Sequence, residues 1–242
     1  MEAENGATAG WKPPGKPLAS GRTADVYGLP GGRVLRRYRD GRSAEAEESL
    51  LFRLGRLGYP VPRVHREAAP GEVRLPGDLV MERLHGPTLA EAALGGRESF
   101  ARVGATLARL LDHLQALPGG LVHLDLHPEN VLRTARGPVV IDWCDAREGR
   151  PPGQDRAVSA VILAEVAVGP IPPARAMLTA LLDHLARPDD VPGQPPLTDE
   201  ELAWARDLRL ANPTLSAAET RALDLALELV AETAAATAAR RS

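Results

Sequence analysis

A polar loop enclosed by apolar residues constrains this chain more than any other feature. The run HLDLHPENVL at residues 123–132 is followed by VVIDW at residues 139–143. The apolar flanks are typical of two buried strands, and a loop between buried strands is a rigid mount for side chains. We therefore expect Asp125, Asn130 and Asp142 to converge on one point.

These three residues are of the types that phosphoryl transfer requires. Magnesium prefers oxygen ligands and takes one or two from a protein, so the sequence predicts Asn130 and Asp142 as its pair. Asp125 is then free to accept a hydrogen bond from a substrate hydroxyl and to take its proton. Considered alone, Asp125 or Asp142 would more often be a turn or cap residue. Their joint spacing with Asn130 favours catalysis.

The histidines and the single cysteine do not form a recognisable metal site. No further histidine or cysteine lies near His123 and His127, and no H-E-x-x-H helix frames them. We predict that both are hydrogen-bonded scaffold residues. Cys144 is the only cysteine, which excludes an intramolecular disulfide, and we predict that it is a small buried side chain.

Composition limits the class of partner. The 242 residues carry a formal net charge of -3, which excludes the broad basic field of a general nucleic-acid binder. The longest apolar stretch, residues 157–168, is too short to span a membrane and contains Glu165. Without a secretory signal, the sequence predicts a cytoplasmic protein with neither a nucleic-acid nor a membrane partner. Its oligomeric state is left open.

The hydrophobic pattern predicts two lobes after a flexible leader at residues 1–17. Residues 18–86 form a first lobe, in which short strands broken by glycine make a meander, followed by a helix over 43–57. Two further strands are predicted over 63–67 and 78–84. The break His85-Gly86-Pro87 leads into a second lobe, 87–242, which is mainly helical. Helical periodicity covers residues 98–117, 156–168, 173–185, 198–210 and 216–238.

The H-x-D-x-H-x-x-N run and the later I-D-W resemble the aminoglycoside phosphotransferase and choline kinase-like family. The similarity extends in order from about Leu18 to Ala157. It implies an α+β, bilobal, protein-kinase-like fold with a small antiparallel sheet and one main helix in the first lobe. It also implies Mg²⁺, ATP or GTP as the phosphoryl donor, and a small-molecule hydroxyl acceptor. An aminoglycoside or another antibiotic is one such acceptor, so a role in resistance and a role in metabolism both stay open.

The resemblance also assigns residues around the phosphates of the nucleotide. It implies that residues 20–24 form the phosphate-covering turn, with a single glycine, and that Arg36 stands where the family has a lysine. Arg37 is the alternative, but neighbouring strand residues point to opposite faces, so only one can reach the nucleotide. Glu47 is the expected ion-pair partner. The turn residues are Ser20, Gly21, Arg22 and Thr23.

A second set of residues is implied around the base. Residues 80–84 resemble the hinge, where the backbone near Glu82 and Leu84 would recognise a purine. Asp155 resembles the aspartate that braces the catalytic loop, and Leu124 stands where many relatives have glycine. The remaining base-pocket residues are Met81, Val34, Leu132 and Ile141.

Two other functions were weighed against this one. A protein kinase needs a long activation segment ending in a motif such as A-P-E, but only twelve residues separate Asp142 from Asp155. A nucleotide-binding pseudokinase or regulatory module is the second, because the strand lysine is missing. Five acidic residues could bind a polyamine-like substrate, although a solvated loop and helix start explains them equally well. They are Asp189, Asp190, Asp199, Glu200 and Glu201.

Overall fold

The computed structural model describes residues 15–21, 23–69, 72–169, 171–185, 197–211 and 217–240. The chain divides into two compact units, the first ending at Leu84 and the second beginning at His85. The lobe boundary predicted after Gly86 lies two residues further along. Most of the predicted leader and Arg22 lie outside the described residues.

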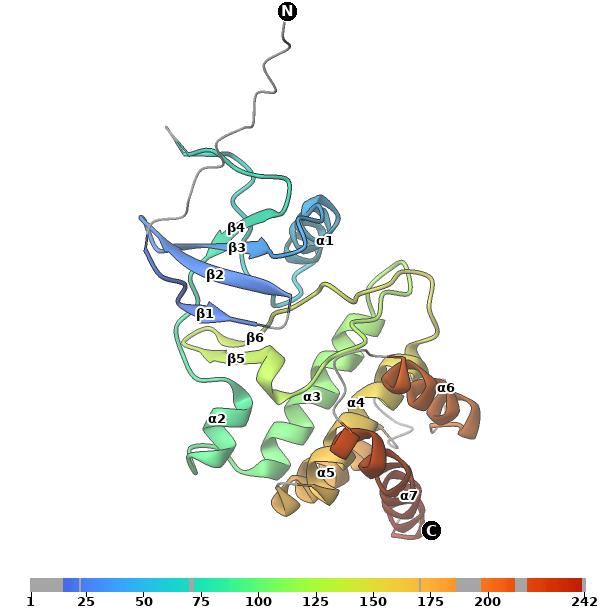
Figure 1. Cartoon of the computed structure of the whole chain (residues 1–242). Helices are drawn as coiled ribbons and strands as arrows, with labels where there is room; N and C mark the ends of the chain where they lie inside the picture. Colours follow the sequence, from blue (N-terminus) through green and yellow to red (C-terminus); the bar gives the residue numbers. More distant parts are fainter. Residues whose placement is uncertain are drawn as a thin grey trace, which may run out of the picture. The chain divides into compact units, whose positions relative to one another are not determined.

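The first unit is built on an antiparallel sheet with strand order β1-β2-β3-β4 (Figure 1). The predicted meander is present, and its tight β2–β3 turn uses Gly31 and Gly32 at positive φ, which suits the twist of a hairpin. In register, Arg36 of β3 lies between Val26 of β2 and Leu79 of β4. The strands are β1 (Ala19–Ser20), β2 (Ala24–Leu29), β3 (Arg33–Tyr38) and β4 (Asp78–Glu82).

One helix accompanies this sheet. α1 (Glu45–Arg56) carries three glutamates in its first turn, where their negative charges interact favourably with the positive end of the helix dipole. Its buried face contains Leu51, Leu54 and, unusually for a charged residue, Glu47. The fold class predicted for the first lobe, a small antiparallel sheet with one main helix, is confirmed.

The strand predicted over residues 63–67 does not form. Only Val64 makes an isolated bridge, to Met81 of β4. The backbone N–H of Arg63 donates to the Glu82 side chain at 2.8 Å instead of to a strand carbonyl, and Pro62 has no N–H to donate. Two backbone bonds flank this bridge, from the Glu82 N–H to the Arg63 carbonyl and from the His65 N–H to the Val80 carbonyl, both at 2.9 Å, and the pairing stays a single bridge.

The second unit is mainly helical, as predicted, and is arranged around α4 (Pro152–Val168; Figure 1). α4 is buried on nearly all sides and packs against α5, α6 and α7. The other helices described in this unit are α2 (Leu89–Leu94), α3 (Phe100–Gln115), α5 (Arg175–Leu185), α6 (Asp199–Leu210) and α7 (Ala217–Ala239). A hairpin, β5 (Val131–Thr134) and β6 (Gly137–Val140), supplies its two strands.

Two helices differ from the sequence prediction by more than two residues. α2 was missed, although Thr88 and Glu91 form a capping box at its start. α4 begins at Pro152, four residues before the predicted start at Arg156, because proline suits the first turn of a helix. None of the helices in the described ranges is both long and apolar enough to cross a membrane.

Candidate active site

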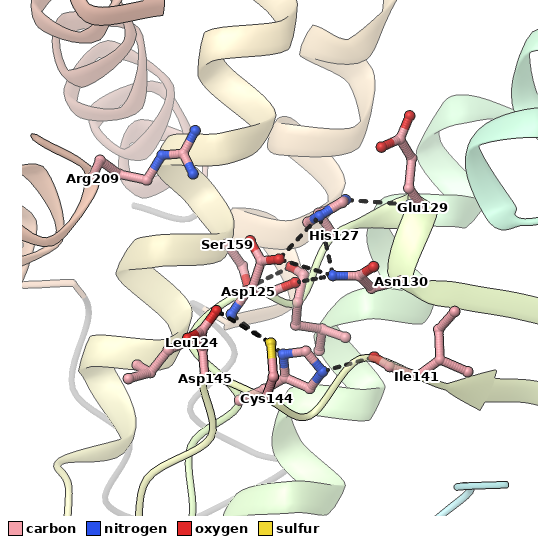
Figure 2. Close-up of polar contacts among 12 residues, drawn as sticks. Leu124, Asp125, His127, Glu129, Asn130, Ile141, Cys144, Asp145, Ser159 and Arg209 are labelled. Carbon is pink, nitrogen blue, oxygen red and sulfur yellow. Dashed lines mark hydrogen bonds and ion pairs between the residues drawn. The ribbon is translucent and has the colours of Figure 1, made fainter. Parts of the chain in front are cut away.

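Asp125 lies at the centre of the polar loop in the second unit (Figure 2). Asn130 donates from Nδ2 to the Asp125 main-chain oxygen at 2.9 Å and to Asp125 Oδ2 at 3.0 Å. His127 Nε2 lies 3.5 Å from the same Oδ2. A short 3-10 turn, Pro128–Asn130, returns Asn130 toward Asp125. The loop therefore holds one carboxylate between an amide and an imidazole.

The first two turns of α4 hold this loop from behind. Asp155, which is fully buried, accepts the backbone N–H groups of His123 at 2.9 Å and Leu124 at 2.7 Å. One turn further along the helix, Ser159 Oγ donates to the Leu126 carbonyl at 2.8 Å. Because residues four apart share a helix face, α4 fixes the loop on both sides of Asp125. The contacts of Asp155 are those of a brace.

His123 links the loop to the segment that carries Asp142. Its ring is buried, lies 4.5 Å from the Trp143 ring, and accepts the Asp125 N–H on Nδ1 at 3.3 Å. Nε2 lies 3.1 Å from the Ile141 carbonyl. Because Nδ1 accepts, Nε2 carries the proton and donates it to that carbonyl. A scaffold role of this kind was predicted for His123, whereas His127 also contacts the carboxylate itself.

The backbone is strained at two points of the site. Leu124 has φ 64° and Asp142 has φ 63°, and no other non-glycine residue in the described ranges has a positive φ. A left-handed conformation costs an L-residue roughly 1–2 kcal/mol. Such strain persists only where the surroundings impose it, and it gathers at functional sites. Glycine at the Leu124 position would relieve it, because glycine adopts a positive φ without steric cost.

The surroundings of Asp125 favour its ionised form. Burial raises the pKa of Asp125, but the His127 hydrogen bond and the charges of His127, His123 and Arg209 hold it below the ordinary value of 3.8. Asp155 differs, since burial raises its pKa above the ordinary value despite its two backbone donors. The catalytic candidate is thus the more acidic of the two carboxyl groups.

Asn130 and Asp142, the predicted magnesium pair, are joined through the backbone. The Ile141 N–H donates to the Asn130 carbonyl at 2.9 Å, so the residue before Asp142 is tied to Asn130. β6 ends at Val140, which leaves Asp142 in the following loop and not at a strand end. Asn130 uses its Nδ2 toward Asp125, so its Oδ1 is turned to the other side. No cluster of three His, Cys, Asp or Glu side chains suited to a metal occurs in the described ranges.

In the first unit, Arg36 and not Arg37 pairs with Glu47. Arg36 Nη1 lies 2.7 Å from both oxygens of Glu47, and the Tyr38 hydroxyl bonds the same carboxylate. Arg37 points to the other face of β3, where it forms a two-point ion pair with Asp78 at 2.6 and 2.7 Å. The strand alternation is the predicted one, and it gives the two arginines different partners.

The other predicted nucleotide residues belong to separate units. Gly21 closes the β1–β2 turn by donating to the Ala24 carbonyl at 2.9 Å, with Ser20 and Thr23 exposed beside it. Val34 of β3 is the register partner of Met81, and Glu82 and Leu84 follow it. Leu132 lies in β5 and Ile141 just after β6, both in the second unit. Arg22 lies outside the described residues.

Sequence reasoning missed three residues of this site. Ser159 carries a readable signal, because it follows Asp155 by one helical turn. Arg209 and Glu165 form an ion pair at 2.8 Å between α6 and α4, and no local pattern connects them with Asp125. Cys144, which was predicted to be buried, is only partly buried, and its Sγ donates to Asp145 Oδ2 at 3.6 Å.

The chain is similar to known proteins in both sequence and fold. No curated protein matches the chain. Among solved structures, a choline/ethanolamine kinase family protein from Mesorhizobium loti is similar with a TM-score of 0.52 and 16% identity, over 95% of this chain and 94% of the other. That likeness confirms the predicted fold. The profile of the phosphotransferase enzyme family matches residues 14–112 and 96–169, which is more than half of the chain. The chain belongs to the phosphotransferase enzyme family.

Proposed function

We propose that this phosphotransferase moves the γ-phosphoryl group of magnesium-bound ATP or GTP to a hydroxyl of a small molecule, with Asp125 as base. The observation that carries the proposal is the contact of Asn130 with Asp125 on a loop that α4 braces. A fixed carboxylate beside an amide is the arrangement that positions a hydroxyl nucleophile in phosphoryl transfer.

Asp125 accepts the hydrogen bond of the acceptor hydroxyl and orients its oxygen toward the γ-phosphorus. As the new P–O bond forms and the bond to the β,γ-bridging oxygen breaks, the hydroxyl proton passes to Asp125. A base with a lowered pKa is weak, so this proton moves late, when the oxygen has already lost electron density to phosphorus. Positioning therefore contributes more than basicity.

Asn130 and Asp142 are the residues that would hold magnesium, through Oδ1 of the amide and the carboxylate. The strained backbone at Asp142 and the tie between Ile141 and Asn130 fix the directions of these two groups. Their oxygen donors suit the ion, which when bound neutralises charge on the phosphates. Because the pKa of Asp125 is lowered, this carboxyl group is ionised without the help of the metal.

In the first unit, Arg36 is proposed as the phosphate-binding cation. Glu47 holds Arg36 through Nη1, which lies 2.7 Å from both carboxylate oxygens, and a guanidinium is suited to binding phosphate oxygens. Ser20, Gly21, Arg22 and Thr23 are proposed to cover the phosphates, and Val34, Met81, Glu82, Leu84, Leu132 and Ile141 to enclose the base. Glu47 acts here by orienting Arg36.

A nucleotide-binding module without turnover is the second candidate. The observation that favours it is the engagement of Arg36, which Glu47 and Tyr38 both contact in a buried setting. The first candidate is preferred because Asp125, Asn130 and Asp142 are all retained, with the loop geometry that catalysis needs.

Labelled phosphate separates the two candidates. The protein is incubated with magnesium and γ-labelled ATP or GTP and a panel of aminoglycosides, other hydroxylated antibiotics, sugars, amino alcohols and hydroxy acids. Transfer to one class, reduced about 10²–10⁴-fold in Asp125→Asn, is the expected result. Nucleotide binding without transfer to any member would favour the regulatory module, and full turnover in Asp125→Asn would remove Asp125 as the base.

A further inference from the structure

A buried cation stands beside the catalytic loop. Arg209, in the last turn of α6, is only 12% exposed and gives Nη2 to Glu165 at 2.8 Å. Its Nε is buried and has no hydrogen-bond partner among the described residues. A buried N–H without an acceptor is costly, so the guanidinium has donor capacity that these residues do not use. Figure 2 shows the guanidinium on the end of the side chain that faces the loop.

Arg209 is connected through α4 to the loop that carries Asp125 (Figure 2). α4 relates the two, because Ser159 holds the loop and Glu165 of the same helix holds Arg209. A molecule with its hydroxyl at Asp125 therefore has a positive charge within its neighbourhood.

The helix that carries Arg209 is held in place by apolar packing. An apolar cluster joins α4 to α6 and α7, and a rigid seat of this kind suits a residue that binds a ligand. The members of the cluster are Ala157, Val158, Val161, Ile162, Ala205 and Leu223.

We propose, as an extension of the phosphotransferase function above, that Arg209 binds an oxyanion of the acceptor. The acceptor is then a hydroxyl compound that carries a carboxylate or a phosphate ester, and not a polyamine. A guanidinium matches either oxyanion through paired N–H groups. A polyamine would place its own positive charge against Arg209.

Of the five acidic residues considered for a polyamine, the three that the structure describes lie in the first turn of α6. Glu201 is used locally, since its side chain accepts the Thr198 N–H at 2.9 Å and its own N–H donates to Thr198 at 3.2 Å. Asp199 and Glu200 lie exposed in the same first turn of α6. Asp189 and Asp190 lie outside the described residues.

Four probes with the same carbon chain test the charge preference: 4-hydroxybutyrate, 4-hydroxybutyl phosphate, 4-hydroxybutyramide and 4-amino-1-butanol. Their binding to the full chain with MgADP is measured by calorimetry. Arg209→Gln/Glu165→Gln is the informative variant, because removing the arginine alone would leave a buried carboxylate unpaired. Glu165→Gln alone keeps the cation. Arg206→Gln is the matched control, since Arg206 lies on the same helix and pairs with Asp224 near the surface.

We expect one or both anionic probes to bind about 10- to 100-fold more tightly than the amide. The carboxylate probe binds most tightly if the acceptor carries a carboxylate, and the phosphate probe does so if the acceptor carries a phosphate ester. The preference is lost in the double variant and retained in Glu165→Gln and Arg206→Gln. Tightest binding of the amine, an unchanged preference in the double variant, or no binding of any probe would overturn the inference. Anion binding without phosphoryl transfer to any acceptor would instead contradict the phosphotransferase proposal alone.

Discussion

The charged cluster of the first unit and the candidate catalytic loop of the second are both largely buried, but they are held in different ways. Arg36 and Glu47 face each other as two full charges, with side-chain oxygens and nitrogens making the contact. The loop is held by one carboxylate, Asp155, whose partners are neutral backbone amides. The first arrangement fixes side chains relative to each other, whereas the second fixes the path of the chain. We therefore expect damage to the first to appear mainly in stability and damage to the second mainly in rate.

The largest effect on stability is expected for Glu47→Gln. The substitution leaves the Arg36 charge buried without its counter-charge, and breaking a buried ion pair in this way costs about 3–5 kcal/mol. Denaturant unfolding measures the loss. Glu48→Gln is the matched control on the next residue of α1, because Glu48 pairs with the half-exposed Arg66 and a surface pair contributes about 0–1 kcal/mol. Equal losses in the two variants would contradict the contrast between buried and surface pairs.

Asp155→Asn is expected to lower the rate more, and the stability less, than Glu47→Gln does. Asparagine accepts one backbone N–H and turns its own NH₂ against the other, which costs about 1–3 kcal/mol, less than Glu47→Gln because no charge is left buried. The loop around Asp125 shifts, and we expect kcat to fall about 10²-fold. Unfolding and steady-state kinetics are compared with Asp207→Asn, an exposed aspartate of α6. A variant that loses stability but keeps its kcat would show that Asp155 does not position the loop.

Asp155 also makes a prediction about pH. Its folded pKa is raised, so the native state binds the proton more readily than the unfolded chain. Stability from this group is fully present below the unfolded value of 3.8 and is lost as the pH rises toward the folded pKa. In Asp155→Asn this fall is absent. The free energy of unfolding of both proteins is measured from pH 3.8 upward. If it changes with pH in the same way in the native protein and in Asp155→Asn, the pKa of Asp155 is not raised.

The two regions were also predicted from the sequence to different extents. Asp125, Asn130 and Asp142 stood out because a polar run between apolar strands is a local pattern. The choice between Arg36 and Arg37 stayed open, because alternation shows that two residues face opposite ways but not which face meets α1. In the structure it is Arg36 that contacts Glu47, a pairing that depends on the packing of α1 against the sheet. Arg209 was missed for the same reason, since its contact with Glu165 joins two helices whose packing no periodicity reveals.

Leu124 tests whether the loop carries backbone strain. Leu124→Gly and Leu124→Ala remove the same buried side chain, but only glycine adopts φ 64° without a clash. We expect the glycine variant to be about 1 kcal/mol more stable than the alanine variant, after the greater freedom of glycine in the unfolded chain is counted. Denaturant unfolding of the two proteins measures the difference directly. Greater stability of the alanine variant would mean that the left-handed conformation at this position is not imposed by Asp155.

Substitutions of His127 are expected to have the smallest effect, a shift in the pKa of Asp125. Burial alone would raise the pKa of Asp125, and the His127 contact at 3.5 Å helps to lower it. The acidic limb of the kcat/KM profile should therefore lie below pH 3.8 in the native protein. His127→Ala removes both the hydrogen bond and the charge and should move the limb to higher pH. His127→Gln keeps a donor and should move it less. If the acidic limb of both variants stays at the native pH, the pKa of Asp125 is lowered by His123 and Arg209 instead of by His127. The loop would then depend on a residue of another helix, as Arg36 depends on Glu47 of α1.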